Sequence, residues 1–248
     1  MRPYPTLREL DLAARTVRKV TPTLDVETEL WGKGHLTVAG MDEVGRGAWA
    51  GPLTVGIAVL ARDCPPVPDG LADSKFLSEA QRERMVPVVR AWVGHWAVGE
   101  ASVEEVDRLG VTAALRTAGW RALAALPRHP DVIILDGGHD YLSDPMEETL
   151  FCPERSIPPV RTEVKGDARC AVVAAASILA KSHRDLHMAA LAGQFPQYGW
   201  ERNAGYAGAA EHLDGVAAHG LSVHHRRSWR MPAQSVPGAA AIPGTTAG

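Results

Sequence analysis

Four acidic residues lie beside glycines or at the ends of expected strands and helices, where a carboxylate is difficult to explain as part of an apolar core. They are Asp42 and Glu43 ahead of Gly45-Arg46-Gly47, Asp136 ahead of Gly137-Gly138, and Asp167 after Lys165-Gly166. Mg²⁺ requires oxygen ligands, and carboxylates from separate chain segments can form an open site that keeps several waters. Two such ions, about 3.5 to 4 Å apart, can stabilise both the attacking and the leaving oxygen of a phosphoryl transfer. The first hypothesis is therefore a divalent-metal site for phosphoryl transfer.

Each of these carboxylates also has an explanation that involves no metal. Asp167 could cap the N-terminus of the helix that follows it, and Asp136 could be a turn residue with Gly137 at positive φ. Glu43 could lie at a solvated strand edge, although two adjacent carboxylates repel each other unless a cation is nearby. The metal hypothesis rests on the four residues together.

The segment Gly45-Arg46-Gly47 allows the backbone to approach a ligand closely. It lacks the third glycine of a dinucleotide fingerprint and the Gly-Lys-Ser/Thr end of a phosphate loop, so it predicts no nucleotide cofactor. Its glycines free the backbone amides for a ligand, and Arg46 is available for a phosphate or a sugar. A tight hairpin turn is the alternative.

Length and composition indicate a folded protein. The chain has 248 residues, of which 46% are hydrophobic and 22% charged, with 26 Lys and Arg against 29 Asp and Glu. These values are near globular averages and exclude a disordered or fibrous chain. The net charge of -3 gives no global positive field, so a nucleic acid would have to be bound by local patches.

The expected environment is the cytoplasm, without membrane contact. The three cysteines form no C-x-x-C pair, which favours a reducing compartment without a zinc or disulfide framework. Residues 1–20 lack the continuous apolar stretch of a secretory signal. The longest apolar stretch, 171–180, is interrupted by Ser177 and is about half of the roughly 20 residues that a membrane span requires.

Turn signals and hydrophobic periodicity predict a mixed β-sheet with helices packed against it. Strands are expected over 36–42, 52–60, 95–101, 131–135 and 159–164, the first two as an antiparallel pair. Two helices begin with capping boxes, Ser78 with Gln81 and Ser102 with Glu105. A long Ala-rich helix is expected over 168–191, and a last helix near 209–219.

Ordered motifs between residues 38 and 229 resemble those of bacterial ribonuclease HII. The stretch 40–47 and Ala50-Gly51-Pro52 are similar to the opening signature of that family. The later motifs follow in the same order: Asp73-Ser74-Lys75, Leu135-Asp136-Gly137, Lys165-Gly166-Asp167-Ala168, 174–181, Arg184-Asp185, Tyr198-Gly199, Gly205-Tyr206 and His225-Arg226-Arg227-Ser228. The resemblance covers the whole expected domain.

This resemblance implies an α/β, RNase H-like fold, with a central mixed β-sheet flanked by helices and a C-terminal helical part. The catalytic domain would span 36–230, after an N-terminal extension over 1–35 and before a disordered tail over 231–248. The implied activity hydrolyses the phosphodiester 5′ of ribonucleotides, in RNA–DNA hybrids and at single ribonucleotides in duplex DNA, with Mg²⁺ or Mn²⁺. It leaves 5′-phosphate and 3′-hydroxyl ends, and we expect a monomer.

The resemblance also assigns roles to residues. The family's metal-binding, catalytic carboxylates correspond to Asp42, Glu43, Asp136 and Asp167. The loop and tyrosine that read the 2′-hydroxyl, the group that distinguishes RNA from DNA, correspond to Gly45, Arg46, Gly47 and Tyr206. Candidate phosphate contacts are Lys75, Lys181, Arg226 and Arg227. The alternatives are solvated surface charge for the basic residues and a core or surface aromatic for Tyr206.

Three positions depart from the family pattern. Phe76 stands where a second lysine is common, which would remove a backbone contact, and Ala207-Gly208 stands where Gly-Thr is usual, which would remove a hydroxyl near the substrate. Gly138 replaces a frequent asparagine. None of these changes removes a carboxylate.

Two other functions are compatible with this fold. A nucleic-acid-binding protein without catalysis is disfavoured because binding alone would favour neutral or basic residues at the four carboxylates. Another RNase H-like nuclease, such as a junction resolvase or DEDD exonuclease, would share the acidic ligands but not the Gly-Arg-Gly loop with Tyr206.

Overall fold

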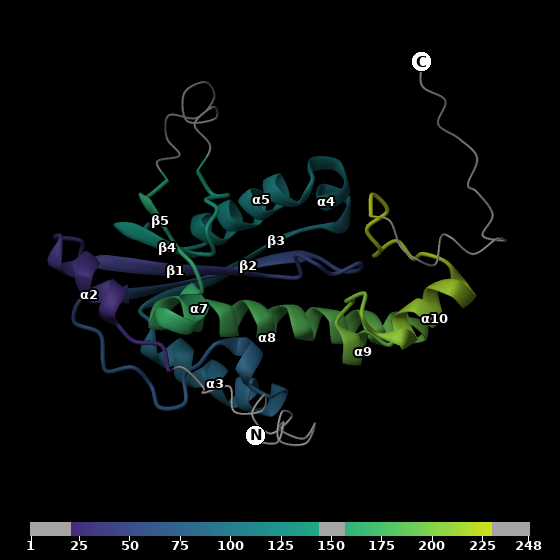
Figure 1. Cartoon of the computed structure of the whole chain (residues 1–248), viewed down its shortest axis with the longest axis horizontal. Helices are drawn as coiled ribbons and strands as arrows, with labels where there is room; N and C mark the ends of the chain where they lie inside the picture. Colours follow the sequence, from purple (N-terminus) through teal and green to yellow (C-terminus); the bar gives the residue numbers. More distant parts are fainter. Residues whose placement is uncertain (1–20, 144–156, 230–248) are drawn as a thin grey trace, which may run out of the picture.

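A five-stranded mixed sheet forms the centre of the molecule. The computed structural model describes residues 21–143 and 157–229; the N-terminal residues 1–20 and the predicted tail 231–248 lie outside the described residues. The strand order is β3-β2-β1-β4-β5 (Figure 1). Their bounds are β1 Thr37–Val44, β2 Leu53–Ala61, β3 His95–Ala101, β4 Val132–Asp136 and β5 Val160–Glu163. The predicted mixed sheet is confirmed.

The pairing directions bring three strand ends to one edge of the sheet. β2 pairs antiparallel with both β1 and β3. The pairs β1 with β4 and β4 with β5 are parallel. The carboxyl ends of β1, β4 and β5 therefore meet at the same edge, which is where ligands bind in open α/β sheets. Met41 is paired with Leu135, so Asp42 and Asp136 follow directly on neighbouring strands.

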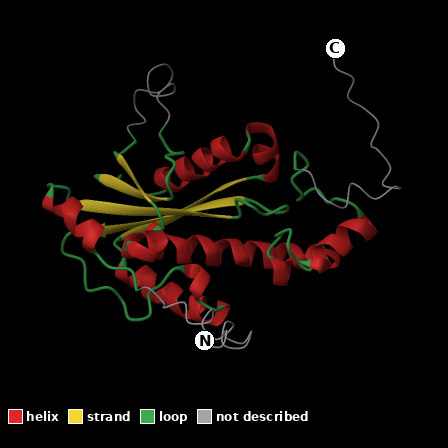
Figure 2. Ribbon diagram, in the orientation of Figure 1, coloured by secondary structure: helices red, strands yellow, loops and turns green. Residues whose placement is uncertain are grey.

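Helices cover both faces of the sheet (Figure 2). One face packs against α2 Asp25–Gly32, α3 Glu79–Trp92 and α8 Ala171–Gln194, and the other against α4 Val103–Leu109 and α5 Val111–Ala124. The remaining short elements are η1 Ser74–Phe76, α7 Gly166–Arg169, η2 Pro196–Tyr198, α9 Trp200–Asn203 and α10 Ala210–His219. This is the layered arrangement that the sequence predicts.

Local signals explain where several helices begin and end. Both predicted capping boxes form, with Ser78 and Gln81 at the start of α3 and Ser102 and Glu105 at the start of α4. The helix expected after Ser102 is divided into α4 and α5 because Gly110 adopts φ 76. Likewise Cys170 is extended and separates α7 from α8, so the predicted helix over 168–191 is two helices.

Helix α2 lies within the range that the sequence analysis assigned to an N-terminal extension. Val26, Leu30 and Trp31 are buried in the same core cluster as α8. The Glu27 carboxylate, also buried, accepts a hydrogen bond from the Val172 amide at 2.9 Å. The folded unit therefore begins before residue 36. The sequence did not predict that α2 belongs to the core because its contacts are with α8, which is distant along the chain.

Glycines on the strands allow the helices to approach the sheet closely. A Cβ atom on Gly40 would lie 2.4 Å from the Val172 carbonyl carbon in α8. On the opposite face, a Cβ atom on Gly99 would lie 2.1 Å from the Ala118 carbonyl oxygen in α5. These contacts are with helix backbone, so a larger residue would displace a whole helix.

The C-terminal helical part packs around Trp200 beyond the end of the sheet, at the right of Figure 1. Trp200 is fully buried and stacks on Tyr198 with ring centroids 4.9 Å apart. Ala50 from the loop after β1 and Met188 from α8 belong to the same cluster. The loop that contains Gly45-Arg46-Gly47 is thereby connected to the C-terminal part.

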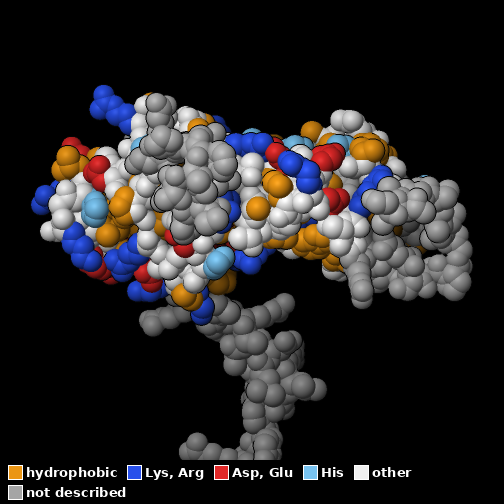
Figure 3. Space-filling view, turned by 90° about the horizontal axis from the view of Figure 1, so that it is seen from above, with side chains coloured by type: hydrophobic (Ala, Val, Ile, Leu, Met, Phe, Trp, Pro, Cys, Tyr) orange, Lys and Arg blue, Asp and Glu red, His pale blue; other side chains and the backbone are white. Residues whose placement is uncertain are grey.

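The visible surface carries both signs of charge. On the face drawn in Figure 3, Lys and Arg side chains are interspersed with Asp and Glu, in keeping with the small net charge. Within the described ranges, no helix combines the length and the apolar character that crossing a membrane requires. Contacts to a polyanion would therefore depend on local groups rather than on one large basic face.

The packing of α5 on β3 predicts a stability effect at Gly99. We expect Gly99→Ala to lower the free energy of unfolding by about 1 to 3 kcal/mol, the usual effect of overpacking, as measured by urea denaturation. Gly193→Ala is the matched control: Gly193 is an exposed residue of α8 whose added Cβ meets nothing within 4 Å. Equal urea midpoints for the two variants would contradict the close contact.

Candidate active site

Three carboxylates converge at the sheet edge where β1, β4 and β5 end. Asp42 lies on β1, Asp136 ends β4, and Asp167 lies in α7 directly after β5. One carboxylate oxygen from each lies within 4.8 Å of the other two. Asp42 and Asp167 are buried and Asp136 is half-buried. The structure thus brings together three of the four predicted metal ligands.

The Asp136 carboxylate itself fixes the position of Asp167. Its Oδ1 atom accepts hydrogen bonds from the Gly166 amide at 2.7 Å and from the Asp167 amide at 3.4 Å. The turn into α7 is made possible by Lys165, which adopts the left-handed conformation at φ 59. Two of the predicted ligands are therefore connected through the backbone.

The structure distinguishes between the alternative explanations for Asp167 and Asp136. Asp167 does not cap the long helix: the N-cap of α8 is Cys170, and the Asp167 Oδ2 atom bonds to the Lys75 Nζ atom at 2.5 Å. Asp136 is indeed followed by a turn, with Gly137 at φ 94. Its turn position and its place in the carboxylate cluster are compatible.

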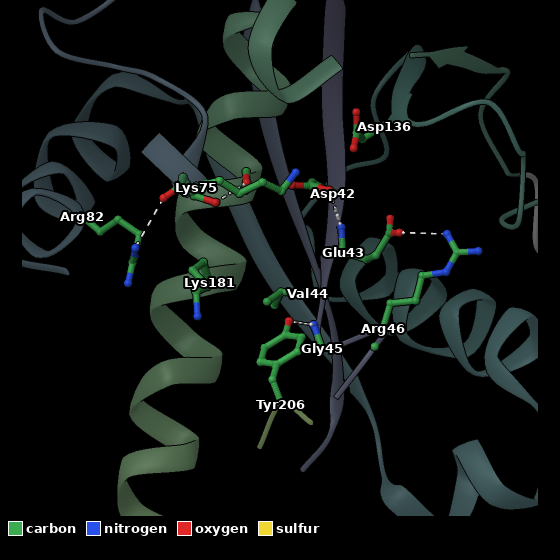
Figure 4. Close-up of a pocket in the computed structure, with 13 residues that line it drawn as sticks. Asp42, Glu43, Val44, Gly45, Arg46, Lys75, Arg82, Asp136, Lys181 and Tyr206 are labelled. Carbon is green, nitrogen blue, oxygen red and sulfur yellow. Dashed lines mark hydrogen bonds and ion pairs between the residues drawn. The ribbon is translucent and has the colours of Figure 1, made fainter. Parts of the chain in front are cut away.

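Glu43 is separated from the other carboxylates because adjacent strand residues face opposite sides of a sheet. Its Oε1 atom pairs with the Arg46 guanidinium at 3.4 Å. Its Oε2 atom is buried and has no hydrogen-bond partner among the described residues. Glu43 still borders the same cavity as Asp42 and Asp136 (Figure 4).

Burial and mutual repulsion raise the pKa values of these carboxyls. Burial raises the pKa of Asp42 well above its usual value, the charge of Asp136 adds to the rise, and a hydrogen bond from Ser177 opposes it. Burial and then Asp167 raise the pKa of Asp136. Burial also raises the pKa of Glu43 and outweighs the opposing effect of Arg46. The site therefore holds more negative charge than its protein partners neutralise.

Ser177 belongs to the 174–181 motif and interrupts an apolar stretch, but the sequence did not indicate it as a residue of the site. It lies on α8, where its hydroxyl bonds to Asp42 and lies 2.9 Å from the Ser74 hydroxyl. A lone polar residue on the sheet-facing side of an apolar helix was the available signal. Its partner could not be identified without the packing of α8 on β1.

A cavity of about 430 Å³ joins three of the carboxylates, but not Asp167, to most of the predicted substrate residues. Its lining includes Asp42, Glu43, Asp136, Gly45, Arg46, Gly47, Lys75, Lys181 and Tyr206. Arg82, which the sequence analysis did not select, also lines it and bonds to Asp185 at 3.1 Å. Lys181 pairs with the other oxygen of the same Asp185 carboxylate, at 2.5 Å.

Arg226 has a different place from the surface phosphate contact that the sequence analysis assigned to it. It is fully buried, and its guanidinium donates to the carbonyl oxygens of Gly45 at 2.6 Å and Arg46 at 3.0 Å. Arg184, also fully buried, donates to the carbonyl oxygens of Ala50 and Pro52, each at 2.9 Å. These two arginines bind the carbonyl groups of the loop from inside the protein. Spacing along the chain cannot distinguish such an arginine from a solvent-facing one.

The loop is left with amide groups available on the cavity side. The Gly45 amide donates to the Tyr206 hydroxyl oxygen at 3.1 Å (Figure 4). Within the part of the chain that the structure describes, the Arg46 and Gly47 amides have no hydrogen-bond acceptor. A Cβ atom on Gly45 would lie 2.3 Å from the Arg184 Nε atom, so glycine is required there. The loop and Tyr206 therefore form one polar surface beside the carboxylates.

The remaining predicted positions lie at the margin of the site. Phe76 is 46% exposed on η1, next to Lys75, and does not line the cavity. Ala207 and Gly138 are not among the lining residues either. The Arg227 amide bonds to the Asp107 carboxylate at 2.8 Å. The departures from the family pattern therefore leave the carboxylate cluster unchanged.

The family model for Ribonuclease HII matches residues 39–231. The chain belongs to the ribonuclease HII family. It is 47% identical over 212 residues to a ribonuclease HII of Streptomyces griseus, covering 84% of each chain. It is 43% identical over 210 residues to a ribonuclease HII of Thermus thermophilus, covering 85% of this chain and 94% of that one. As a member of the ribonuclease HII family, the protein is a hydrolase of the ribonuclease H type.

Solved structures support the same fold. The ribonuclease H2 from Pyrococcus horikoshii superposes with a TM-score of 0.62 at 26% identity, over 78% of this chain and 93% of that one. Bst-RNase HIII, solved in complex with Mn²⁺, gives a TM-score of 0.54 at 25% identity, over 75% of this chain and 63% of that one. The RNase H-like fold inferred from the motifs is therefore confirmed.

The donor set fits a hard divalent cation. Ribonuclease H enzymes use divalent metals, and the cluster offers carboxylate oxygens, the ligands that such ions prefer. The raised pKa values and the unpartnered Glu43 oxygen both indicate negative charge that the protein leaves incompletely neutralised. A bound cation would remove that repulsion.

The charge of the site predicts a metal-dependent stability. Because the folded-state pKa values of Asp42 and Asp136 are raised, ionisation destabilises the fold, and in chelator the free energy of unfolding should fall as pH rises through those pKa values. Mn²⁺ at about 100 times its Kd should restore about 2.7 kcal/mol, as measured by chemical denaturation.

Asp136→Asn tests the source of that effect. The amide oxygen retains the acceptor for Gly166, but one repelling charge is lost. We expect the variant to be at least as stable as wild type in chelator and to gain clearly less from Mn²⁺. An equal gain in both proteins would show that the stabilising ion binds elsewhere.

Proposed function

We propose that this protein is an endoribonuclease that cuts on the 5′ side of ribonucleotides, in RNA–DNA hybrids and at single ribonucleotides in duplex DNA. The family acts on RNA–DNA hybrids. The observation that carries the finer proposal is the shared cavity, in which the carboxylates lie beside the free amides of the Gly-Arg-Gly loop and the Tyr206 hydroxyl. Cleavage chemistry and recognition of a ribose are thereby adjacent.

Two Mg²⁺ or Mn²⁺ ions are proposed to be held by Asp42, Glu43, Asp136 and Asp167. Carboxylates alone would repel a phosphodiester, so a cation must invert the local charge. Such ions supply Lewis-acid stabilisation of the attacking and leaving oxygens. The protein contributes the fixed arrangement: Asp136 orients Asp167 through the α7 backbone, and Ser177 orients Asp42.

The 2′-hydroxyl can be recognised by groups that the loop leaves free. The Arg46 and Gly47 amides are donors, and the Tyr206 oxygen accepts from Gly45, so the phenolic proton remains available to be donated. A ribose 2′-hydroxyl both donates and accepts, whereas deoxyribose offers neither group at that position. A donor-rich surface at this point therefore favours RNA at the cut site.

Basic side chains around the cavity are proposed to bind the phosphate backbone. Lys75 and Lys181 line the cavity, although each is paired with a carboxylate in the structure. Arg226 supports the same surface from inside the protein by binding the loop carbonyls.

We propose that the protein acts as a monomer in the cytoplasm. Its role there would be to remove ribonucleotides from DNA and to remove RNA primers.

The decisive experiment is cleavage of an end-labelled DNA duplex that contains one ribonucleotide, compared with an all-DNA duplex. We expect cutting on the 5′ side of the ribonucleotide with Mg²⁺ or Mn²⁺, and none with chelator or without the ribonucleotide. Tight binding without cutting would indicate a binding protein instead. Cutting of a ribonucleotide-free junction would indicate another RNase H-like nuclease.

Asp42→Asn should reduce kcat by a factor of about 10² to 10³, the scale of losing one group that stabilises transition-state charge. Asparagine keeps an oxygen for the Glu43 amide bond, so the fold should be retained, which circular dichroism can verify. Full activity of a correctly folded variant would contradict the assignment of this site.

Tyr206→Phe should preferentially reduce cleavage at single ribonucleotides. Loss of one hydrogen bond of about 1 to 1.5 kcal/mol corresponds to roughly a tenfold fall in kcat/KM. A uniform RNA–DNA hybrid presents many alternative cut sites and should be less affected. Equal losses on both substrates would refute a role for the hydroxyl in reading the junction.

A further inference from the structure

Two buried histidines connect the C-terminal helical part to the backbone of Tyr206. His212 lies on α10 and His225 in the segment after it, and both side chains are fully buried. Their Nε2 atoms are 3.0 Å apart. Neither residue lines the cavity, and neither touches the carboxylates, so the metal site does not account for them.

The hydrogen bonds fix the tautomer of His212. Its Nδ1 atom lies 3.1 Å from the Tyr206 carbonyl oxygen, which can only accept, so Nδ1 carries the proton. In a neutral imidazole, Nε2 is then the acceptor. That atom receives the Trp200 indole N–H at 3.3 Å.

The tautomer of His225 follows from that of His212. Because His212 Nε2 accepts, His225 Nε2 must donate across the 3.0 Å contact. His225 Nδ1 is then the acceptor for the Ser222 amide and hydroxyl, each at 2.9 Å. In this arrangement every polar atom of the two rings has a partner. The single lone pair of His212 Nε2 is shared by two N–H donors, and that of His225 Nδ1 is shared by the Ser222 amide and hydroxyl.

The neutral state of both rings agrees with their surroundings. Burial lowers the pKa of His225 to about 4, with nearby His212 adding to the fall, and burial also lowers the pKa of His212. A proton on His212 Nε2 would put two hydrogens between the rings and break the chain. The arrangement is therefore the one present at neutral pH.

The carbonyl group that His212 binds belongs to Tyr206, which borders the cavity. The chain reaches Tyr206 through Ala204 at φ 47 and Gly205 at φ 78, a conformation that needs external support. The small residues Ala207 and Gly208 follow it and offer little side chain to anchor the turn. The bond from His212 supplies such an anchor at the Tyr206 backbone.

We propose that His212, held as the Nδ1–H tautomer by His225, is a positioning residue that orients Tyr206 for recognition of the ribonucleotide. This inference rests on the proposed function of Tyr206. It places part of the selectivity for single ribonucleotides in a buried hydrogen-bond chain that runs from Ser222 through both histidines to the Tyr206 backbone.

Two substitutions of His212 separate this role from packing. In His212→Asn the amide nitrogen takes the place of Nδ1 and retains the donor to Tyr206, whereas in His212→Gln the amide reaches the Nε2 position and loses that donor. Both remove the same buried ring. We expect His212→Gln to lower the ratio of kcat/KM for a single-ribonucleotide duplex over a uniform hybrid about tenfold, and His212→Asn to keep the wild-type ratio.

A double variant tests the route of the effect. In a Tyr206→Ala background, His212→Gln should cause no further change in the ratio, because the residue that it orients is already lost. An equal fall in the ratio for His212→Asn and His212→Gln, or a further fall in the Tyr206→Ala background, would overturn the proposal.

The tautomers can be measured in the unaltered protein, which covers the case in which the variants do not fold. Nitrogen-15 NMR at neutral pH should show His212 protonated at Nδ1 and His225 at Nε2; the opposite tautomers would overturn the proposal. A wild-type protein that fails to cut single-ribonucleotide duplexes refutes the proposed function and with it this inference. Normal cutting with an unchanged ratio in His212→Gln refutes this inference alone.

Discussion

The repulsion between carboxylates held at one sheet edge is the constraint around which the molecule is built. Parallel pairing of β1, β4 and β5 forces Asp42, Asp136 and Asp167 together, and burial makes their ionised forms unfavourable. The fold offsets this only in part, through the Lys75 ammonium, backbone amides at the turn into α7 and the Ser177 hydroxyl. The close approach of α8 to Gly40 is what brings Ser177 within reach. Incomplete neutralisation leaves the edge ready for a cation.

The neighbouring loop is held by positive charge, and the charged groups lie inside the protein rather than at the cavity. Arg184 and Arg226 are buried, and carbonyl oxygens rather than carboxylates surround their guanidinium groups. Because the C=O and N–H of a trans peptide group point in opposite directions, fixing the Gly45 and Arg46 carbonyls inward leaves the next amides toward the cavity. The cavity thus has an acidic wall from the sheet and a donor-rich wall from the loop. A phosphodiester with its cations and a ribose hydroxyl need these two kinds of surface side by side.

The sheet and the capped helices could be predicted from the sequence because each depends on local signals, and the clustering of Asp42, Asp136 and Asp167 could be predicted from their motifs. Ser78, Ser102 and the end of β4 at Asp136 are examples. Three features were not accessible. Glu43 borders the same cavity as Asp42 and Asp136 but is outside the cluster of three carboxylates, which the spacing of residues along the chain does not show. Arg226 is buried only because the C-terminal segment pairs with the loop after β1. The contribution of α2 depends on contacts with α8 that are distant in sequence.

The two walls of the cavity also differ in what supports them. The carboxylates stand on strands in the centre of the domain, where displacement would disturb the sheet itself. Tyr206 and the loop depend on hydrogen bonds to Arg226 and the His212–His225 pair of the C-terminal part, and to Arg184 of α8. Substitutions in that part can therefore alter how a ribose is recognised without moving the carboxylates. Under the proposed function, such a division would combine chemistry at a fixed carboxylate site with selectivity that is adjusted from a separate structural layer.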